Sequence, residues 1–597
     1  MKSLKLIHKI GLIVFTIGFL TYLSLFFLGQ YQLNKIDLKE AVGGQTFSVV
    51  DKYAQHIYGT KYDDQFSFVS DFKAILSQAN EEIKSKFEIS SDVASKIANS
   101  TEGNSFQQSA IEKVIGTPTE EVAQWQIKQL TDYTGWMEGR EYESAEELVT
   151  QLEKVITDVN NSIISQKGFS QDNINNKAFT ITKQSEVGPV AQNPWLWLLL
   201  AIGIPIIGAI MYLLPRLKTQ HAGIKNDGIF HSALKNRGWI GILLGTFLIS
   251  FYVFLYWFPE YMTSWIVMVD PISNILSGNP ASQWFMYGFL YTLAILVMGI
   301  RMIIKYRHSP YQMVRTVSVM FFQLAFAFVI PEILVRLNQP YMDLKNMWPL
   351  DYSFFFDYRL NEMVEAGTIG LFMLGWGIAL FTLGVPIFTY LYGKRWYCSW
   401  VCGCGGLAET LGDPYRQLSD KSLGAWKIER WLIHGVLVFA VVMTAAVLYT
   451  YFTGSSQLLG MNTYNIRAVY GFGIGSIFSG VIGTGFYPFM GNRVWCRFGC
   501  PLAAYLGLVQ RFKSRFRITT NGGQCISCGN CSTYCEMGID VRWYAQRGQN
   551  IIRSSCVGCG VCSSVCPRGV LNLENRDENG RFNQPSLVGN DSFGVQS

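Results

Sequence analysis

Apolar stretches long enough to cross a bilayer alternate with polar segments along the 597-residue chain. The first, residues 9–28, follows Lys2, Lys5 and Lys9 and has no small-residue cleavage site behind it, which predicts an uncleaved anchor (residues 1–30) rather than a signal peptide. The later stretches are Trp195–Leu214, Trp239–Phe258, Phe285–Ile304, Val317–Val335, Ile369–Leu391, Trp431–Phe452 and Val469–Met490. The last is rich in glycine, and a re-entrant segment is its alternative. The pattern predicts a mainly α membrane protein of about eight transmembrane helices, with residues 194–520 as the bundle.

Residues 31–193 form a polar segment between the first two apolar stretches. Apolar residues recur there at three- and four-residue spacing, as in Asp71–Lys86 and Ser144–Ile164, which predicts helices. Composition predicts a loop near Asn99–Ser109 and a linker over Asn173–Val190. The segment contains no cysteine, nucleophile set or phosphate loop. We therefore expect an α-helical interaction or spacer domain that contacts a periplasmic partner.

Charge separates this segment from the rest of the chain. It has 24 acidic and 15 basic residues, a net charge of −9, which leaves +15 for the remainder of a chain whose total is +6. Lysines and arginines gather in alternate loops, within residues 215–238, 301–316, 392–430 and 491–517. The positive-inside rule then predicts an inner-membrane protein with both termini cytoplasmic and residues 31–193 extracytoplasmic. With 49% hydrophobic residues and no nucleic-acid motif, the chain is expected to contact the lipid bilayer and not nucleic acid.

The tail contains two cysteine quartets of identical spacing, C-x2-C-x2-C-x3-C, within residues 521–575. They read Cys525-Ile-Ser-Cys528-Gly-Asn-Cys531-Ser-Thr-Tyr-Cys535 and Cys556-Val-Gly-Cys559-Gly-Val-Cys562-Ser-Ser-Val-Cys566. In two-cluster ferredoxins of this spacing the fourth cysteine binds the other cluster. The spacing therefore predicts a ferredoxin-like α+β domain with two [4Fe–4S] clusters, one on Cys525, Cys528, Cys531 and Cys566, the other on Cys556, Cys559, Cys562 and Cys535.

Several neighbours of these cysteines bear on the same prediction. Zinc also binds C-x2-C pairs, but two matched quartets followed by Pro567 favour iron–sulfur. Gly529, Gly558 and Gly560 allow backbone N–H groups to approach the cluster. Glu536 stands where a proline is expected after the first quartet and is predicted to loosen that turn. The remaining residues, 576–597, are expected to be a flexible tail.

Five further cysteines lie where predicted spans meet the cytoplasm: Cys398, Cys402, Cys404, Cys496 and Cys500. Two pairs have a four-residue step, which on a helix places both thiols on one face. Arginines at 395, 493 and 497 would offset negative charge there. A third redox centre of iron–sulfur or copper, reversible dithiol–disulfide chemistry, and inert packing cysteines are all open interpretations.

From about Ile369 to Asn575 the chain resembles the membrane polyferredoxins related to NosR, NapH and CcoG. The resemblance rests on the two C-x3-C elements, the second followed by Pro501, and on the two-cluster tail. It implies electron transfer between a cytoplasmic or quinone donor and a membrane or periplasmic acceptor, as in nitrous oxide or nitrate reduction. Another branch implies a copper-centre assembly factor acting as a membrane reductase.

The chain departs from that pattern in three respects. Gly403 stands in place of a proline, Cys404 is extra, and Gly116-Thr117-Pro118-Thr119 does not fit the flavin-attachment motif of NosR-like proteins. No flavin is therefore expected. No haem is expected either, because the six histidines lie in loops or near helix ends and no C-x2-C-H occurs.

Some charged residues outside the cysteine motifs remain candidates. Glu332 and Arg336 precede an aromatic, acidic loop, where a structural ion pair is favoured over a quinol site. Glu409, Asp413 and Arg416 are expected in a solvated loop, with a role beside the cluster as the alternative. We expect an iron–sulfur electron-transfer protein with redox partner proteins and a quinone, and no catalytic residue is assigned. A redox sensor is a further alternative, and whether the chain is part of a quinol-linked oxidoreductase stays open.

Overall fold

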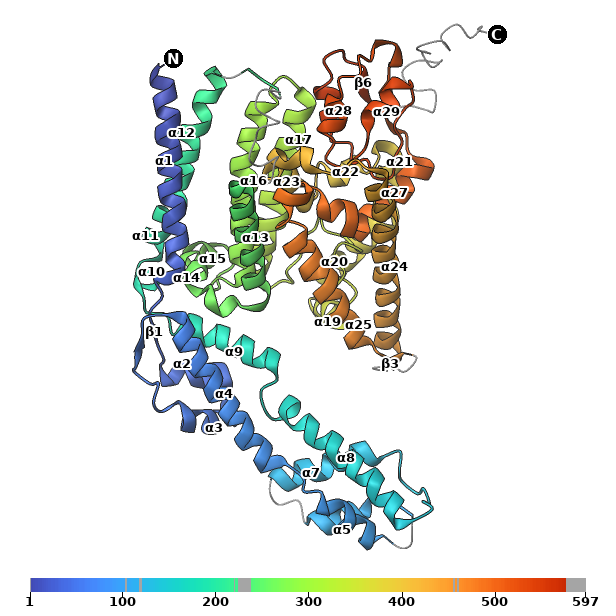
Figure 1. Cartoon of the computed structure of the whole chain (residues 1–597). Helices are drawn as coiled ribbons and strands as arrows, with labels where there is room; N and C mark the ends of the chain where they lie inside the picture. Colours follow the sequence, from blue (N-terminus) through green and yellow to red (C-terminus); the bar gives the residue numbers. More distant parts are fainter. Residues whose placement is uncertain are drawn as a thin grey trace, which may run out of the picture. The chain divides into compact units, whose positions relative to one another are not determined.

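The computed structural model describes residues 2–101, 105–116, 121–219, 221–223, 238–454, 457–458 and 461–575. The chain divides into two compact units (Figure 1). Unit 1 contains Met1–Leu23, Trp195–Trp257 and Met268–Ser597, and unit 2 contains Ser24–Pro194 and Phe258–Val267. The predicted tail, residues 576–597, lies outside the described residues.

Unit 2 is a helical domain, as its periodicity predicts. Its long helices α4 (Gln65–Phe87) and α8 (Ala145–Gln166) pack together and begin at the side-chain caps Asp64 and Ser144. The other elements are η1 (Leu25–Phe27), β1 (Tyr31–Gln32), α2 (Lys35–Val42), α3 (Gly44–Ala54), β2 (Lys61–Tyr62), α5 (Asp92–Ser100), α6 (Ser109–Ile115), α7 (Glu121–Thr134), α9 (Gln171–Gln184), α10 (Pro189–Gln192) and η4 (Pro259–Tyr261). Strands β1 and β2 pair antiparallel.

The predicted linker over Asn173–Val190 is wrong, because α9 occupies most of it. Ser170 caps this helix, and Ile174, Ala178 and Ile181 are buried on one side of it. The spacing of these three residues is helical, but asparagine and glutamine between them lower the local apolar content. Burial against α2 and α4 therefore outweighs a composition typical of a linker.

A short segment from later in the chain, Phe258–Val267, completes unit 2. Glu260 is fully buried there and pairs with Lys73 at 2.7 Å. The Tyr31 and Thr263 hydroxyls lie 2.8 Å apart, and the Ser264 hydroxyl donates to Glu186 at 2.8 Å. Unit 2 is therefore built from two parts of the chain, Ser24–Pro194 and Phe258–Val267, which are separated in sequence by residues of unit 1.

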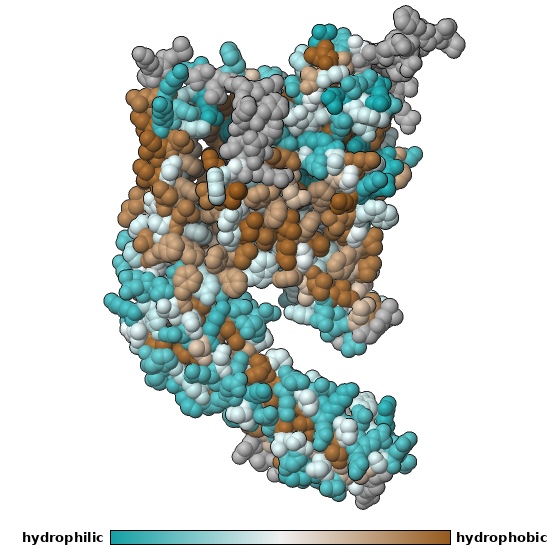
Figure 2. All heavy atoms as spheres, viewed as in Figure 1, coloured by the Kyte–Doolittle hydropathy of each residue, from teal (hydrophilic) through white to brown (hydrophobic). Residues whose placement is uncertain are grey.

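Among the described residues, seven helical segments of unit 1 are long and apolar enough to cross a membrane. They are Leu4–Phe27, Pro194–Lys218, Trp239–Trp257, Gln283–Lys305, Pro310–Arg336, Gly367–Tyr392 and Leu423–Thr453. The first of them ends in unit 2. Hydrophobic side chains cover the surface of these helices (Figure 2). In order, the segments comprise α1 (Lys2–Ser24) with η1; α11 (Pro194–Leu198), η2 (Leu199–Gly203) and α12 (Ile204–Thr219); α13 (Trp239–Trp257); α16 (Gln283–Lys305); α17 (Pro310–Phe321), η5 (Phe322–Val329) and α18 (Ile330–Arg336); α20 (Gly367–Ala379), η6 (Leu380–Gly384) and α21 (Val385–Tyr392); and α24 (Leu423–Thr453).

The eighth predicted span, Val469–Met490, is not a single long apolar helix. Helix α25 (Thr463–Tyr470) continues into the π-helical η8 (Gly471–Ile482), and a turn separates this from α26 (Tyr487–Met490). Seven of the eight predicted helices are thus confirmed as helices of spanning length. Glycines in the eighth lower its hydrophobicity and allow close packing, since a Cβ at Gly480 would lie 2.6 Å from the Tyr256 ring.

Small residues also let α1 and α12 touch. A Cβ at Gly208 would lie 2.3 Å from the backbone nitrogen of Phe15, and one at Gly11 would lie 2.6 Å from that of Tyr212. Such close backbone approach is typical of helices that pack in lipid. The pairing holds the first apolar helix against the second within unit 1.

The rest of unit 1 includes the elements that carry the cysteines. Its elements are α15 (Asp270–Leu276), α19 (Asp357–Glu365), α22 (Arg395–Cys398), α23 (Gly403–Thr410), η7 (Asp413–Leu418), β3 (Gln457–Leu458), β4 (Met461–Asn462), η9 (Trp495–Gly499), α27 (Pro501–Lys513), β5 (Phe516–Thr520), η10 (Gly522–Gln524), α28 (Asn530–Thr533), α29 (Val541–Gln546), α30 (Val561–Ser564) and β6 (Leu571–Asn575), while α14 (Thr263–Met268) crosses the unit boundary. Strands β3 and β4 pair, and β5 pairs antiparallel with β6 from Phe516↔Asn575 to Thr520↔Leu571. The β5–β6 ladder closes the tail domain around both cysteine quartets.

Candidate functional site

The two cysteine quartets of the tail adopt the same backbone turn. Ser527 and Gly558 hold corresponding places and have φ of 59° and 63°, and Gly529 and Gly560 both have φ of 77°. Left-handed residues of this kind make turns whose neighbouring N–H groups form a concave site for anions. The sequence repeat is therefore a conformational repeat, and both loops are shaped to surround negatively charged ligands.

Four cysteines line each of two cavities in this domain. The first cavity is lined by Cys525, Cys528, Cys531 and Cys566. The second is lined by Cys535, Cys556, Cys559 and Cys562. The structure thus brings together the same two sets that the crossed spacing predicts. Ligation of a cluster by each set stays a prediction.

The chemistry of these thiols fits an iron–sulfur cluster. Burial raises the pKa of Cys531 and Cys556 to about 11 and that of Cys559 to about 12. Such thiols stay protonated at neutral pH unless a cationic group offsets the cost of burying thiolates, as iron does. Backbone N–H groups supply further support, as where Ile539 donates to Cys535 Sγ at 3.4 Å.

The surroundings of the two cavities differ sharply. At the first, Cys528 is exposed and the neighbouring Ile526 is 56% exposed. At the second, backbone carbonyls of the cysteine loop accept hydrogen bonds from the helical part of unit 1. The donors are Tyr311 Oη to Gly558 at 2.9 Å, Gln312 Nε2 to Cys559 at 2.7 Å, Ser399 Oγ to Val557 at 2.8 Å and Gln510 Nε2 to Cys556 at 2.9 Å. The cysteine loop at the second cavity therefore docks the tail domain against the helical part of unit 1, whereas the loop at the first cavity faces outward.

The four-residue cysteine pairs lie at breaks between helices. Cys398 ends α22 and Cys402 is the N-cap of α23, while Cys496 lies in η9 and Cys500 is the N-cap of α27. The expected continuous helical face is therefore wrong. All four residues are nevertheless buried in one packed cluster. Burial raises the pKa of Cys398 to about 12, as burial does for cysteines of the tail quartets.

Cys404 differs from these four. Its thiol donates a hydrogen bond to Cys402, which together with the Gly405 N–H lowers the pKa of Cys402 and raises that of Cys404. It is also less buried than its neighbours and lines a separate cavity with Cys402. The structure thus adds a second thiol beside one member of the four-cysteine set.

The expected solvated loop at Glu409, Asp413 and Arg416 is instead a buried ionic network. Arg416 is fully buried and donates to Asp413 at 2.9 Å, and Glu409 pairs with Arg315 and Arg493. Asp413 also accepts from Lys305 at 2.6 Å and Arg301 at 3.1 Å. Burial would raise the pKa of Asp413, but these cations hold it well below its usual range. Residues from four helices and one turn supply the network, so local composition does not reveal its burial.

Glu536 links this network to the tail. It is 1% exposed and pairs with Arg416 at 2.7 Å and with Arg493 at 3.1 Å. Burial would raise its pKa, but Arg416, Arg493 and Arg315 lower it to about 2. The prediction that this residue only loosens a turn is therefore incomplete, because it is an anchor between two parts of unit 1.

Arg493 connects the tail domain with the cysteines that lie at the ends of the long apolar helices. Its Nη2 binds Glu536 beside the second tail cavity, and its Nη1 lies 3.6 Å from Cys496 Sγ and 3.3 Å from the Cys398 carbonyl. Sequence reasoning noted this arginine only as a counter-charge. The sequence feature that could have indicated its role as a link is the carboxylate of Glu536, which directly follows Cys535.

Buried Lys394 was not predicted as a site residue. It is 1% exposed, its backbone N–H donates to Gln510 Oε1 at 2.7 Å, and none of the described carboxylates pairs with its ammonium group. After the raising effect of burial, its charge lowers the pKa of both Cys398 and Cys556. It therefore lies within electrostatic reach of both the membrane thiols and the second tail quartet.

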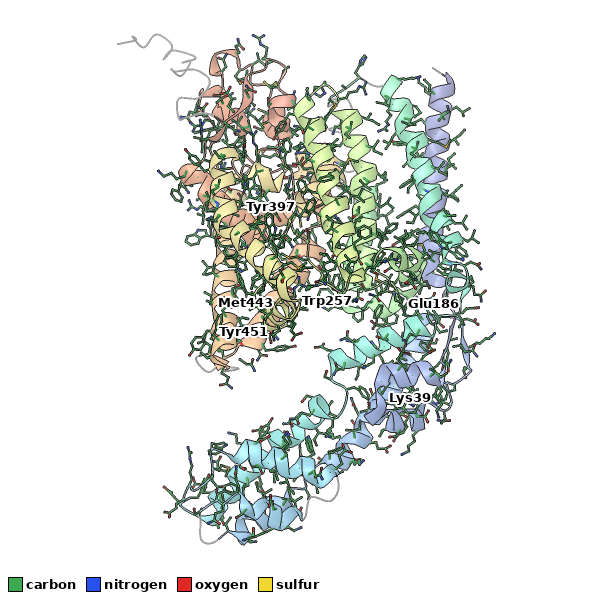
Figure 3. The ribbon with its side chains drawn as sticks, turned by 180° about the vertical axis from the view of Figure 1, so that it is seen from behind. Lys39, Glu186, Trp257, Tyr397, Met443 and Tyr451 are labelled. Carbon is green, nitrogen blue, oxygen red and sulfur yellow. The ribbon has the colours of Figure 1, made fainter. Side chains whose placement is uncertain are left out.

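An aromatic cavity of about 380 Å³ opens beside Cys402 and Cys404. Six tyrosines line it: Tyr287, Tyr291, Tyr341, Tyr352, Tyr397 and Tyr470. Tyr397 lies in the interior of the helical part of unit 1 (Figure 3). The loop after α18 contributes Asp343 and Lys345, which pair at 2.7 Å. The π-helical η5 contributes Gln323, and π-helical turns are common at functional sites.

The other predicted candidates lie elsewhere. Arg336 donates to the Ile275 carbonyl, and no ion pair joins it to Glu332 in the described structure. The expected Glu332–Arg336 pair is therefore wrong. His434 contacts the Arg430 carbonyl of its own helix through Nδ1.

Comparison with known protein families identifies both cysteine regions. A 4Fe-4S dicluster domain matches residues 513–571. A 4Fe-4S binding domain matches residues 374–424 and 472–519, which contain the Cys398–Cys402 and Cys496–Cys500 pairs. The chain therefore carries two kinds of ferredoxin-type 4Fe-4S domain.

Two curated proteins are each similar to about a quarter of the chain. YccM of Escherichia coli (strain K12), whose name assigns it to electron transport, is 30% identical over 175 residues, covering 27% of this chain and 47% of YccM. The methylamine utilization ferredoxin-type protein MauN of Paracoccus denitrificans (strain Pd 1222) is 30% identical over 170 residues, covering 27% and 56%. The chain thus spans about half the length of the curated relatives it matches. No solved structure matches it.

The homology to proteins of the YccM and MauN type supports the resemblance to ferredoxin-type electron carriers. The closer relation to NosR, NapH and CcoG stays a prediction.

Proposed function

We propose that this protein is a membrane-bound iron–sulfur electron-transfer protein with three cluster sites in series. The observation that carries the proposal is the buried connection from the second tail cavity through Glu536 and Arg493 to Cys496. The first cavity is exposed, the second is docked, and the membrane thiols lie behind it. The order of the three sites along unit 1 is that of a relay.

Each site has a distinct set of ligands in this proposal. Cys525, Cys528, Cys531 and Cys566 hold the outer cluster, and Cys535, Cys556, Cys559 and Cys562 hold the middle one. Cys398, Cys402, Cys496 and Cys500 hold a third, in the region that matches a 4Fe-4S binding domain. A [4Fe–4S] cluster supplies one-electron storage at a potential set by its charge environment and hydrogen bonds.

The chain's own residues set the charge around these sites. Arg493 and Lys394 bring positive charge between the middle and inner sets, which favours the more negative, reduced state of a thiolate-bound centre. Glu409 and Glu536 balance the charges of Arg416 and Arg493, so these buried guanidinium groups are paired. The network thus lets charged centres sit close together away from water.

The inner end of the relay is the aromatic cavity. A quinone needs an apolar, mostly aromatic cavity with a few polar groups, and this one combines six tyrosines with Asp343 and Lys345. Its wall includes Cys402 of the inner set. We therefore place quinone exchange there, in a protein of the inner membrane with both termini cytoplasmic. The loop charges support that orientation, as does the common end of unit 1 at which the start of α1 and the tail domain lie (Figure 1).

A second function is favoured by one observation, the hydrogen-bonded Cys402–Cys404 pair at the cavity wall. Two adjacent thiols can bind Cu(I), as a metallocentre assembly factor would require. In that case copper content falls in Cys404→Ser and Cys402→Ser protein, and a copper-free wild type excludes this function.

Anaerobic counting of iron and sulfide, with electron paramagnetic resonance, tests the relay. Three clusters give about twelve irons per chain, and two give about eight. We expect about twelve in the wild type and about eight in Cys496→Ser. About eight in both would limit the relay to the tail, and signals that respond to neither low-potential donors nor quinols would exclude electron transfer.

A further inference from the structure

The surface beside the outer cysteine set, Cys525, Cys528, Cys531 and Cys566, carries mainly positive charge. We define the basic face as Ile526, Cys528, Arg542, Trp543, Arg547 and Arg568. All six residues are exposed, with Ile526 at 56% and Trp543 at 42%. Ile526, Cys528, Arg542 and Arg568 also line the first tail cavity. The face therefore covers the tail site at which a cysteine, Cys528, is exposed.

The basic face is held as one surface by local contacts. Gln546 Nε2 of α29 donates to the Ser527 hydroxyl at 2.7 Å, which fixes the helix beside the first cysteine loop. The Arg542 backbone N–H donates to the Ser532 hydroxyl at 2.8 Å. The Arg547 guanidinium lies 4.1 Å from the centre of the Trp543 ring. Arginines and an aromatic residue around an apolar centre are typical of protein interfaces.

None of the carboxylates in the described residues 521–575 forms an ion pair with an arginine of this face. Within residues 521–575, Glu536 is buried on Arg416 and Arg493, and Asp540 accepts from the Ser532 hydroxyl at 2.6 Å and caps α29. Glu574, on β6, is opposite Arg517 in the β5–β6 ladder. Every fully exposed charged residue in this range is an arginine, and none of the three forms an ion pair with a described residue.

We propose that the basic face binds an acidic soluble electron-carrier protein, and that this is where electrons pass between the chain and the cytoplasm. The inference rests on the proposed relay and names its partner class. Each encounter would transfer one electron between the carrier's redox group and the centre held by Cys525, Cys528, Cys531 and Cys566, with no proton or ligand exchanged. Arginines around an exposed redox edge would steer a negatively charged carrier and raise its association rate.

Binding can be measured without electron transfer. The probe is an oxidised, strongly acidic plant-type [2Fe–2S] ferredoxin, titrated calorimetrically at low ionic strength into the full chain in detergent. We expect Arg542→Gln/Arg568→Gln to weaken binding by about tenfold and to flatten its salt dependence. Lys427→Gln removes an exposed positive charge on α24, lines neither tail cavity, and should leave binding unchanged.

Electron transfer supplies the second readout. Reduced ferredoxin should reduce the double variant about tenfold more slowly than wild type, whereas reduced methyl viologen, a small cation, should not be slowed. Equal ferredoxin binding and rates in both proteins would overturn the proposal. So would arginine substitutions that weaken only binding to phosphatidylglycerol vesicles, because the face would then be a membrane contact. Reduction by viologen proves the relay intact in either case, so the two proposals fail separately.

Discussion

The two cysteine quartets of the tail share one spacing and one backbone turn but have opposite environments. Ser527 and Gly558 match in conformation, as do Gly529 and Gly560. Cys528 is exposed beside three arginines, whereas the Cys556–Cys562 loop is buried and accepts hydrogen bonds from Tyr311, Gln312 and Ser399. The comparison teaches that a repeat encodes ligand geometry, while the neighbours of each copy decide whether it exchanges electrons with solvent or passes them inward.

The residue after each quartet shows the same contrast. Glu536 follows the first quartet and is 1% exposed in the ionic network, whereas Pro567 follows the second and is exposed. Because the fourth cysteines cross over, Glu536 follows a cysteine of the docked cavity and Pro567 follows one of the outer cavity. The charged residue therefore marks the docked side.

The largest effect is expected on removing the anchor. Glu536→Gln leaves Arg416 and Arg493 with less buried negative charge, and breaking a buried pair in this way costs about 3–5 kcal/mol. We expect loss of docking, seen as faster proteolysis between the helical part and residues 521–575, and a lower free energy of unfolding. Pro567→Gln changes an exposed position and should cost less than about 0.5 kcal/mol. Equal stability of the two variants would contradict the contrast between the quartets.

Loss of one ligand from each quartet should be nearly as informative. Cys562→Ser and Cys528→Ser each remove a ligand, so iron content should fall by about four atoms in both. Only Cys562→Ser disturbs the buried loop that docks on Tyr311 and Ser399. We therefore expect increased proteolysis in Cys562→Ser alone. Increased proteolysis in Cys528→Ser as well would mean that the outer quartet also supports docking.

A smaller effect is expected at Lys394, which reaches the docked quartet and the membrane thiols but not the outer quartet. Lys394→Met removes a buried positive charge, so the reduction potentials of the middle and inner centres should fall. A unit charge at about 8 Å and an effective dielectric of about 20 corresponds to about 2 kcal/mol. Redox titration followed by electron paramagnetic resonance measures the shift. Lys427→Met, an exposed change on α24, serves as the comparison, and an equal shift of all centres would contradict the assignment.

The smallest effect is expected at Cys404, which belongs to neither quartet. Its thiol lowers the pKa of Cys402, so Cys402 holds its thiolate at lower pH than it would alone. Cys404→Ala removes the donor and raises that pKa, so alkylation of Cys402 in the iron-depleted protein should begin at higher pH. Cys404→Ser keeps a donor and should shift the profile less. Identical profiles in all three proteins would show that Cys404 does not act on Cys402.

Much of the fold follows from local sequence. Seven apolar stretches form the expected helices, and the helices over Asp71–Lys86 and Ser144–Ile164 are confirmed. The Asn173–Val190 linker failed because burial of Ile174, Ala178 and Ile181 depends on partners elsewhere in unit 2. The eighth apolar stretch does not form one long apolar helix, and its glycines allow neighbouring side chains to pack closely.

By itself, the sequence determined the two tail quartets, because ligand spacing within a short loop is a local property, and the structure groups the cysteines in the crossed sets. It also determined the long apolar helices, because hydrophobicity is summed over neighbouring residues. Only the tertiary structure decided which quartet is docked, that Glu409, Asp413 and Arg416 are buried, and that Arg493 reaches from Glu536 to Cys496. Burial and ion pairing between distant segments depend on which surfaces meet in space, and a short stretch of sequence does not determine which surfaces meet.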